Sequence, residues 1–159
     1  MEAVPHCEAA VRMRPENAQA CNNLGLAYLR LGRVSEGVKY LRRSVELRPN
    51  GGNASLTLAW VLATSPDQSL RNGDYAVVLA ERVAAREQRR SPGALHTLAA
   101  ALAEVGNFET AIATAEEALR LAKDLGDPRL VRELELNLTN YRNHLPLRDP
   151  GLVDGGGVK

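Results

Sequence analysis

The chain has 159 residues, a formal net charge of +1, and 45% apolar against 25% charged residues. This length and mixture are those of one globular domain or one compact array, without the charge excess that would gather phosphates or hold an anionic membrane. Aromatic residues make up only 4%, while alanine and leucine are frequent, so we expect helices and not a β-sandwich.

The N-terminal stretch MEAVPHCEAAVRMRP predicts a helix near residues 2–14 that stops before Pro15. It carries acidic residues and no long apolar run, so it is not a secretory signal peptide. No later run approaches the apolar length of a transmembrane helix. We therefore expect a soluble, cytoplasmic chain that does not insert into a membrane, or an extracytoplasmic one if it belongs to a larger membrane protein.

The next stretch, NNLGLAYLRLGRVSEGVKYLRRSVELRP, predicts two helices near 17–31 and 34–48. Glycine weakens a helix interior by about 1 kcal/mol, yet Gly25 and Gly37 stand inside these helices. We interpret both as small residues at a close crossing of the two helices, where a bulkier side chain would overpack the contact. Gly32 lies between the helices and can adopt the left-handed conformation that ends a helix.

The chain partly matches itself after a shift of 34 residues, which places Pro49 on Pro15. A period of about 34 with the pattern L-G-x-x-Y, a later small residue and a closing proline is typical of the tetratricopeptide repeat. This resemblance implies an all-α fold, a right-handed superhelical array of antiparallel helix pairs with a C-terminal capping helix. The residues that carry the resemblance are Leu24, Gly25, Tyr28, Gly32, Gly37, Leu41, Ser44 and Pro49.

Two further units follow in the same pattern. The first has predicted helices near 52–64 and 73–89, and Ala59 and Ala76 are 17 residues apart where Gly25 and Gly37 are only 12 apart. Five residues have therefore been added to the loop between its helices, which costs little because closure entropy grows slowly with loop length. The second unit has predicted helices near 92–105 and 108–125.

Asp127 and Pro128 are a good N-cap and a good first residue for a last helix near 128–144. Residues 145–159 include three consecutive glycines and are expected to be a disordered tail. The predicted organisation is a single array over 1–144, made of a half repeat at 1–15, repeats at about 17–49, 52–89 and 92–125, and the capping helix.

The last two thirds of the chain also resemble the C-terminal repeat regions of larger bacterial tetratricopeptide proteins. In some of those proteins the repeats follow a multi-span membrane segment of glycosyltransferase-like character. The first predicted helix corresponds to the second helix of a repeat. We therefore expect a piece of a longer protein, or a gene read from an internal methionine.

Residues that could carry catalysis do not form a known pattern. No serine stands in a G-x-S-x-G turn, no glycine-rich phosphate loop occurs, and no second ligand follows a histidine at three or four residues. We expect a non-catalytic chain without cofactor or metal. Cys7 and Cys21 are either two small buried apolar side chains or a disulfide or redox pair. The basic runs Arg42-Arg43 and 86–90 lack interleaved aromatic residues, so nucleic-acid binding is not expected.

The resemblance implies that the first helices of successive repeats line a concave groove, which holds an extended peptide or a partner helix. Trp60, the only tryptophan, is either an anchor for that partner or packs against the added loop. Several slots that are polar in relatives binding chaperone tails are apolar here, so an acidic C-terminal tail is not the expected ligand. The slots that face the groove hold Asn22, Leu26, Arg30, Leu56, Trp60, Ala63, His96, Ala100 and Ala103.

Three functions follow as alternatives from these observations. The first is a protein-interaction scaffold that binds a peptide or partner helix in the groove. The second is a regulatory or substrate-presenting appendage of a larger, membrane-bound glycosyltransferase-like enzyme. The third is self-association, in which the apolar face of the exposed N-terminal helix would pair two copies into a homodimer.

Overall fold

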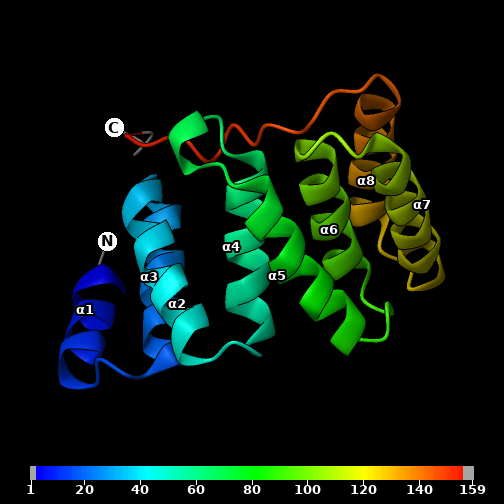
Figure 1. Cartoon of the computed structure of the whole chain (residues 1–159). Coiled ribbons are helices and arrows are strands. Elements are labelled where there is room, and N and C mark those ends of the chain that lie inside the picture. Colours follow the sequence, from blue (N-terminus) through cyan, green and yellow to red (C-terminus); the bar gives the residue numbers. More distant parts are fainter. Residues whose placement is uncertain (1–2, 156–159) are drawn as a thin grey trace.

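The computed structural model describes residues 3–155, and this part of the chain is entirely helical apart from its turns and its C-terminal segment (Figure 1). The predicted helices are confirmed, and each end lies within three residues of the prediction. In chain order the elements are α1 (Ala3–Met13), α2 (Ala18–Arg30), α3 (Val34–Leu47), α4 (Gly52–Thr64), the short 3-10 turn η1 (Gln68–Leu70), α5 (Gly73–Arg86), α6 (Pro92–Glu104), α7 (Phe108–Asp124) and α8 (Pro128–Arg142).

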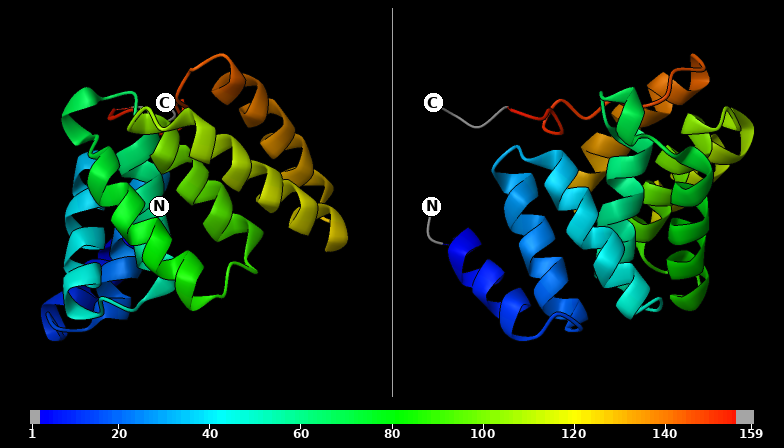
Figure 2. Two further views of the ribbon diagram at one scale, coloured as in Figure 1. Left: turned by 45° about the vertical axis from the view of Figure 1, so that its right-hand side comes forward. Right: turned by 60° about the vertical axis from the view of Figure 1, so that its left-hand side comes forward.

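The helices stack as antiparallel pairs in a single row (Figures 1 and 2). The pairs are α2 with α3, α4 with α5, and α6 with α7, while α1 packs on α2 at one end and α8 packs on α7 at the other. The first helices α4 and α6 also pack directly on each other. This arrangement is the all-α solenoid of helix pairs that the repeat pattern predicts.

Local sequence signals explain where the helices begin and end. Five of them begin with a side chain that accepts a hydrogen bond from a first-turn amide, which satisfies one of the donors left free at a helix start. The expected cap Asp127 is confirmed, since its carboxylate accepts from the Leu130 amide at 3.0 Å. Gly32 has φ +67° just after α2, as the left-handed helix end requires. The five capping residues are Asn17, Asn72, Ser91, Asn107 and Asp127.

The close crossing expected within the first pair is present between Gly25 and Gly37. A Cβ atom on Gly25 would lie 2.8 Å from the Leu41 side chain and 3.1 Å from the Gly37 carbonyl oxygen. A Cβ atom on Gly37 would lie 2.7 Å from the Leu29 side chain and 3.1 Å from the Gly25 carbonyl oxygen. The two helices therefore touch backbone to backbone, and only glycine fits at both positions.

The loop added between α4 and α5 is ordered by its own hydrogen bonds. The Asn72 amide donates to the Leu62 carbonyl at 2.9 Å, and η1 is capped by Asp67. Arg71 pairs with Glu104 at the end of α6 at 2.9 Å, and both side chains are mostly shielded from solvent. The loop thus lies against the neighbouring unit.

The segment after α8 departs from the expectation of a disordered tail. Residues 143–155, here termed the C-terminal strap, run back across the ends of α6 and α4 to the start of α3 (Figure 1). Leu147 packs on the core and Leu152 is only 7% exposed, so two apolar residues fix a segment that is otherwise rich in turn residues. Residues 156–159, which include the rest of the predicted tail, lie outside the described residues.

The strap is also fastened by polar contacts with three units. Arg148 pairs with Glu104 at 2.6 Å, and the Asp149 amide donates to the Thr64 carbonyl at 2.8 Å. Asp154 accepts hydrogen bonds from the first amides of α3 and from the Ser35 hydroxyl. The strap therefore supplies the N-cap that α3 lacks in its own sequence.

The close crossing of α2 and α3 predicts an unusual response to substitution. Gly37→Ala should destabilise the fold by about 1–3 kcal/mol, because overpacking outweighs the gain of about 1 kcal/mol in helix propensity. Gly93→Ala is the matched control, since a Cβ atom there meets nothing within 4 Å. Urea unfolding should show a lower midpoint for the first variant only. An unchanged midpoint in Gly37→Ala would remove the overpacking explanation.

Candidate functional site

The residues expected to line the groove lie on α2, α4 and α6, but they do not share one cavity. Leu26 and Arg30 line a hollow of about 380 Å³ between α1 and α2. Asn22 lines a second, smaller hollow at the junction of the first two units. Leu56 is half-buried and packs on the core. The expected groove is thus divided into separate regions along the array.

The three alanines of the expected groove are fully covered. Ala63, Ala100 and Ala103 each have an exposed fraction of at most 1% and belong to the buried core cluster. They lie on α4 and α6, which pack directly on each other. Their small size therefore serves the packing of the helices, and they offer little surface to a partner.

Trp60 and His96 are brought together at the centre of the array. Their ring centroids are 4.9 Å apart and the rings are tilted by 52°. His96 is 7% exposed, and its Nε2 atom lies 2.8 Å from Nδ2 of Asn137 on α8. Since the amide nitrogen can only donate, Nε2 accepts and the imidazole is the neutral Nδ1-protonated form.

Burial lowers the pKa of His96 to about 4, because the charged imidazolium would lose its hydration. Glu133 lies 4.0 Å from the same Nε2 atom, but its side chain is 43% exposed and its attraction is weakened by solvent. With His96 neutral at pH 7, this contact is not an ion pair. His96 therefore acts as a packed, hydrogen-bonded side chain between α6 and α8.

The indole N–H of Trp60 forms a hydrogen bond within the chain. Its indole Nε1 donates to the carboxylate of Asp149 in the strap at 2.8 Å. The ring itself remains half-buried beside His96. Trp60 thus holds an extended segment that passes over it, and this segment is the chain's own C-terminus.

The hollow between α1 and α2 is mainly apolar. Val4, Cys7 and Leu31 contribute to its wall together with the expected groove residue Leu26. Cys7 is half-buried, whereas Cys21 is fully buried, and both are free thiols. Burial raises the pKa of Cys21. The thiols are therefore apolar packing residues and not a disulfide.

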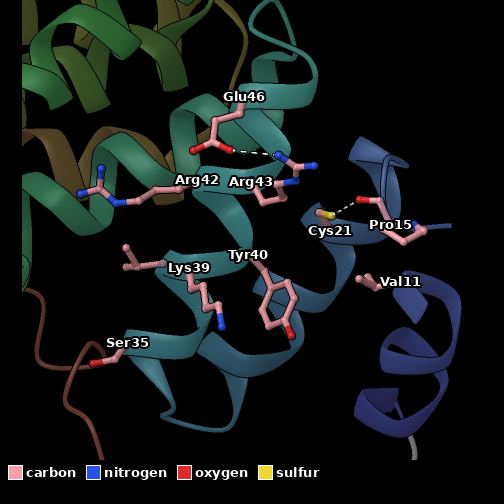
Figure 3. Close-up of a pocket in the computed structure, with 10 residues that line it drawn as sticks. Val11, Pro15, Cys21, Ser35, Lys39, Tyr40, Arg42, Arg43 and Glu46 are labelled. Carbon is pink, nitrogen blue, oxygen red and sulfur yellow. Dashed lines mark hydrogen bonds and ion pairs between the residues drawn. The ribbon is translucent and has the colours of Figure 1, made fainter. Parts of the chain in front are cut away.

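Another hollow, of about 650 Å³, lies between α1 and α3 (Figure 3). Its floor includes Cys21, and its rim carries Lys39, Arg42, Arg43 and the acidic Glu46. Arg43 and Glu46 form an exposed pair at 3.4 Å. None of the residues expected to face the groove lines this hollow.

Three residues that were not predicted contact the expected site or complete a helix start, namely Asn137, Asp149 and Asp154. A signal for the strap was available, because Leu147 and Leu152 are isolated apolar residues among prolines, aspartates and glycines. Asn137 had no comparable signal, since its contact with His96 spans 41 residues.

Within residues 3–155, no group of three or more histidine, cysteine, aspartate or glutamate side chains is placed to hold a metal ion. Over the same residues no helix is both long and apolar enough to cross a membrane.

Comparisons with known proteins agree with this architecture. Two family models described as tetratricopeptide repeat match the chain, one at residues 1–52 and the other at residues 94–129. Together they cover more than half of the 159 residues. The chain therefore belongs to the tetratricopeptide repeat family, a family of non-catalytic repeats that mediate protein–protein interaction.

Individual proteins that resemble this chain have low sequence identity to it. BBSome complex member bbs-4 of Caenorhabditis elegans is 29% identical over 75 residues, which is 47% of this chain and 16% of that relative. A solved structure of the MamA RS-1 ArsTM double mutant has a TM-score of 0.65 at 18% identity and covers 89% of this chain and 84% of its own. The structural likeness concerns the fold, and the chain spans only 16% of the length of the curated relative that it matches.

The buried imidazole predicts a pH dependence of stability. The pKa of His96 is about 4 in the folded chain and about 6.5 in the unfolded chain, so only the unfolded chain gains this proton as the pH falls from about 6.5 to 4. Stability should therefore decrease over this window by about 2–3 kcal/mol through this group. Urea unfolding at pH 7 and pH 4.5 should show a smaller decrease for His96→Gln than for the native chain. Equal decreases would contradict the assignment.

Proposed function

We propose that this chain is a non-catalytic interaction scaffold that holds an extended peptide or a partner helix on the face formed by α2, α4 and α6. One observation supports this proposal above the others, namely that the array already binds an extended segment, its own strap. The strap contacts Trp60, the Thr64 carbonyl and the start of α3. The Thr64 carbonyl and the start of α3 lie at helix ends of two successive units, and Trp60 joins this edge of the array to the face formed by α2, α4 and α6.

The chemistry of the strap indicates what kind of segment this surface suits. The backbone amides of Asp149 and Gly155 donate to the carbonyls of Thr64 and Gly32. Such backbone bonds do not depend on the side chains of the bound segment. Leu152 is buried, and the Asp149 carboxylate accepts from the Trp60 indole. An extended peptide with an acidic residue three positions before a leucine is therefore the partner type that the contacts favour. Such a partner would displace the strap from Trp60.

Substitution at Trp60 tests this function. Trp60→Ala should weaken binding of a captured partner by about tenfold or more, because a buried tryptophan anchor contributes about 2 kcal/mol or more. Asp149→Asn should strengthen the same binding, since it loosens the competing strap. The partner would first be isolated with the purified chain, and calorimetry would then measure its affinity for each variant.

The matched control is Leu136→Ala, which removes an apolar side chain of α8 that is 65% exposed. Its affinity for the partner should equal that of the native chain. Urea unfolding of all variants separates lost binding from lost stability. If Trp60→Ala binds the partner as the native chain does, the groove function with Trp60 as anchor is wrong.

Self-association is a second proposal, and the apolar hollow between α1 and α2 favours it. The half-buried Cys7 and Leu26 in this hollow would be covered by a second copy. The appendage role beside a glycosyltransferase-like enzyme stays a prediction from the sequence, because it concerns chain beyond these 159 residues.

Light scattering as a function of concentration tests the second proposal. The mass of the native chain should rise toward twice that of the monomer, whereas Cys7→Glu should remain monomeric because a buried, unpaired carboxylate is unfavourable at the contact. A native chain that stays monomeric at high concentration would exclude this contact.

A further inference from the structure

A small polar hollow of about 190 Å³ lies where the first two units meet. It is formed by the start of α2, the end of α3, the start of α4 and the end of α5. The residues around it are Ala18, Gln19, Asn22, Ser44, Arg48, Gly51, Gly52, Asn53, Ala54 and Arg86.

A buried amide without a partner faces this hollow. Asn22 is only 6% exposed, and its Oδ1 atom has no hydrogen-bond partner among the described residues. The nearby Ser44 hydroxyl does not donate to this oxygen, because it donates to the Ala18 carbonyl at 2.8 Å. Buried polar atoms are nearly always paired, so an orphan of this kind indicates a missing partner. A half-turn of the amide presents either its oxygen or its two N–H donors to the hollow.

The start of α4 also points to a ligand at this place. The N-cap of this 13-residue helix is Gly51, which has no side chain to accept from the first-turn amides. A Cβ atom on Gly52 would lie 2.5 Å from Nη2 of Arg86, so the guanidinium lies directly against the first turn of α4. Arg48 also lines the hollow, and its side chain lies against Gly51. Amides, helix dipole and two guanidinium groups together favour an anion.

The same chain shows how such a helix start is completed elsewhere. Among the helices described, α3 and α4 begin with residues that form no side-chain cap. At α3 a carboxylate from a distant segment supplies it, since Asp154 accepts from the Ser35 amide at 3.2 Å. A carboxylate borne on an extended segment is therefore a ligand that this fold already uses at an uncapped helix start.

We propose that the hollow around Asn22 and the start of α4 binds the carboxylate of an aspartate or glutamate side chain on a partner peptide. This deepens the proposed function and depends on it for the source of the peptide. The carboxylate accepts hydrogen bonds from the first-turn amides of α4 and from the guanidinium groups of Arg48 and Arg86. The Asn22 amide turns by half, so that its NH₂ group donates to the same carboxylate. Arg86 keeps its hydrogen bond to the Asn50 carbonyl, and its exposed 3.4 Å pair with Glu87 is exchanged for the ligand.

The expectation that the groove does not suit an acidic C-terminal tail concerned other slots. Those slots are filled by Leu26, Leu56, Ala100 and Ala103, and none of them lines this hollow. The proposed site instead joins the groove residue Asn22 and the start of α4 to the ends of the second helices α3 and α5. An internal acidic side chain can reach it without the peptide ending there.

The test is an NMR titration of the full ¹⁵N-labelled chain with acetyl-Gly-Asp-Gly-amide. The amides of Gly52, Asn53 and Ala54 and the side-chain NH₂ of Asn22 should shift saturably. The asparagine form of the peptide should leave them unmoved. Arg86→Gln should weaken the titration by about tenfold, as expected for a charge-assisted bond. Arg90→Gln is the matched control, because it removes an exposed arginine that does not line the hollow.

Several outcomes would overturn the proposal. These are equal shifts with the asparagine peptide, no saturable shift in the native chain, an unchanged titration in Arg86→Gln, or shifts with inorganic phosphate but not with the aspartyl peptide. If Arg86→Gln does not fold, the same titration of Arg48→Gln, which should also be weakened, tests the proposal together with the titration of the native chain. The tripeptide is too short to reach Trp60, so Trp60→Ala should not alter its binding. Failure of the groove function alone would leave this titration intact.

Discussion

The backbone contact between Gly25 and Gly37 is the constraint on which the rest of the array depends. It brings α2 and α3 together without side chains between them, and so sets the spacing at which the next pair can stack. Ala99 and Ala111 occupy the corresponding places of the third unit and are fully buried. Small residues at these crossings let the two helices of each pair lie close together, and the first helices α4 and α6 of the second and third units pack directly on each other.

Much of the fold could be predicted because its signals are local. Helix ends follow from a capping residue such as Asp127 or a left-handed glycine such as Gly32, and both act within one turn of the helix. The repeat period then orders the pairs, since each unit must bury its apolar face on the next. Even the added loop could be located, because it changes the spacing between two small residues.

The candidate site could be predicted only in part, because its details depend on contacts between distant residues. The sequence placed Trp60 and His96 on first helices, but nothing in it indicates that Asn137 would bond to one and Asp149 to the other. The strap was expected to be disordered, since a composition rich in glycine and aspartate does not reveal that Leu147 and Leu152 pack on the core of the array. Local patterns identify the surface, whereas long-range packing decides which part of it is covered.

The strap changes how such an array can unfold. Repeats that touch only their neighbours open one at a time, because stability is a sum of nearest-neighbour terms. Here Asp154 bonds to residues 119 and 120 positions earlier, so the last part of the chain is joined to the first full unit. Fraying of α3 and release of the strap then occur together, because each loses the contacts of the other. The first full unit and the end of the chain are therefore coupled, although other units lie between them. The contact between Asp154 and the start of α3 closes a long loop of chain, so we expect it to form late in folding.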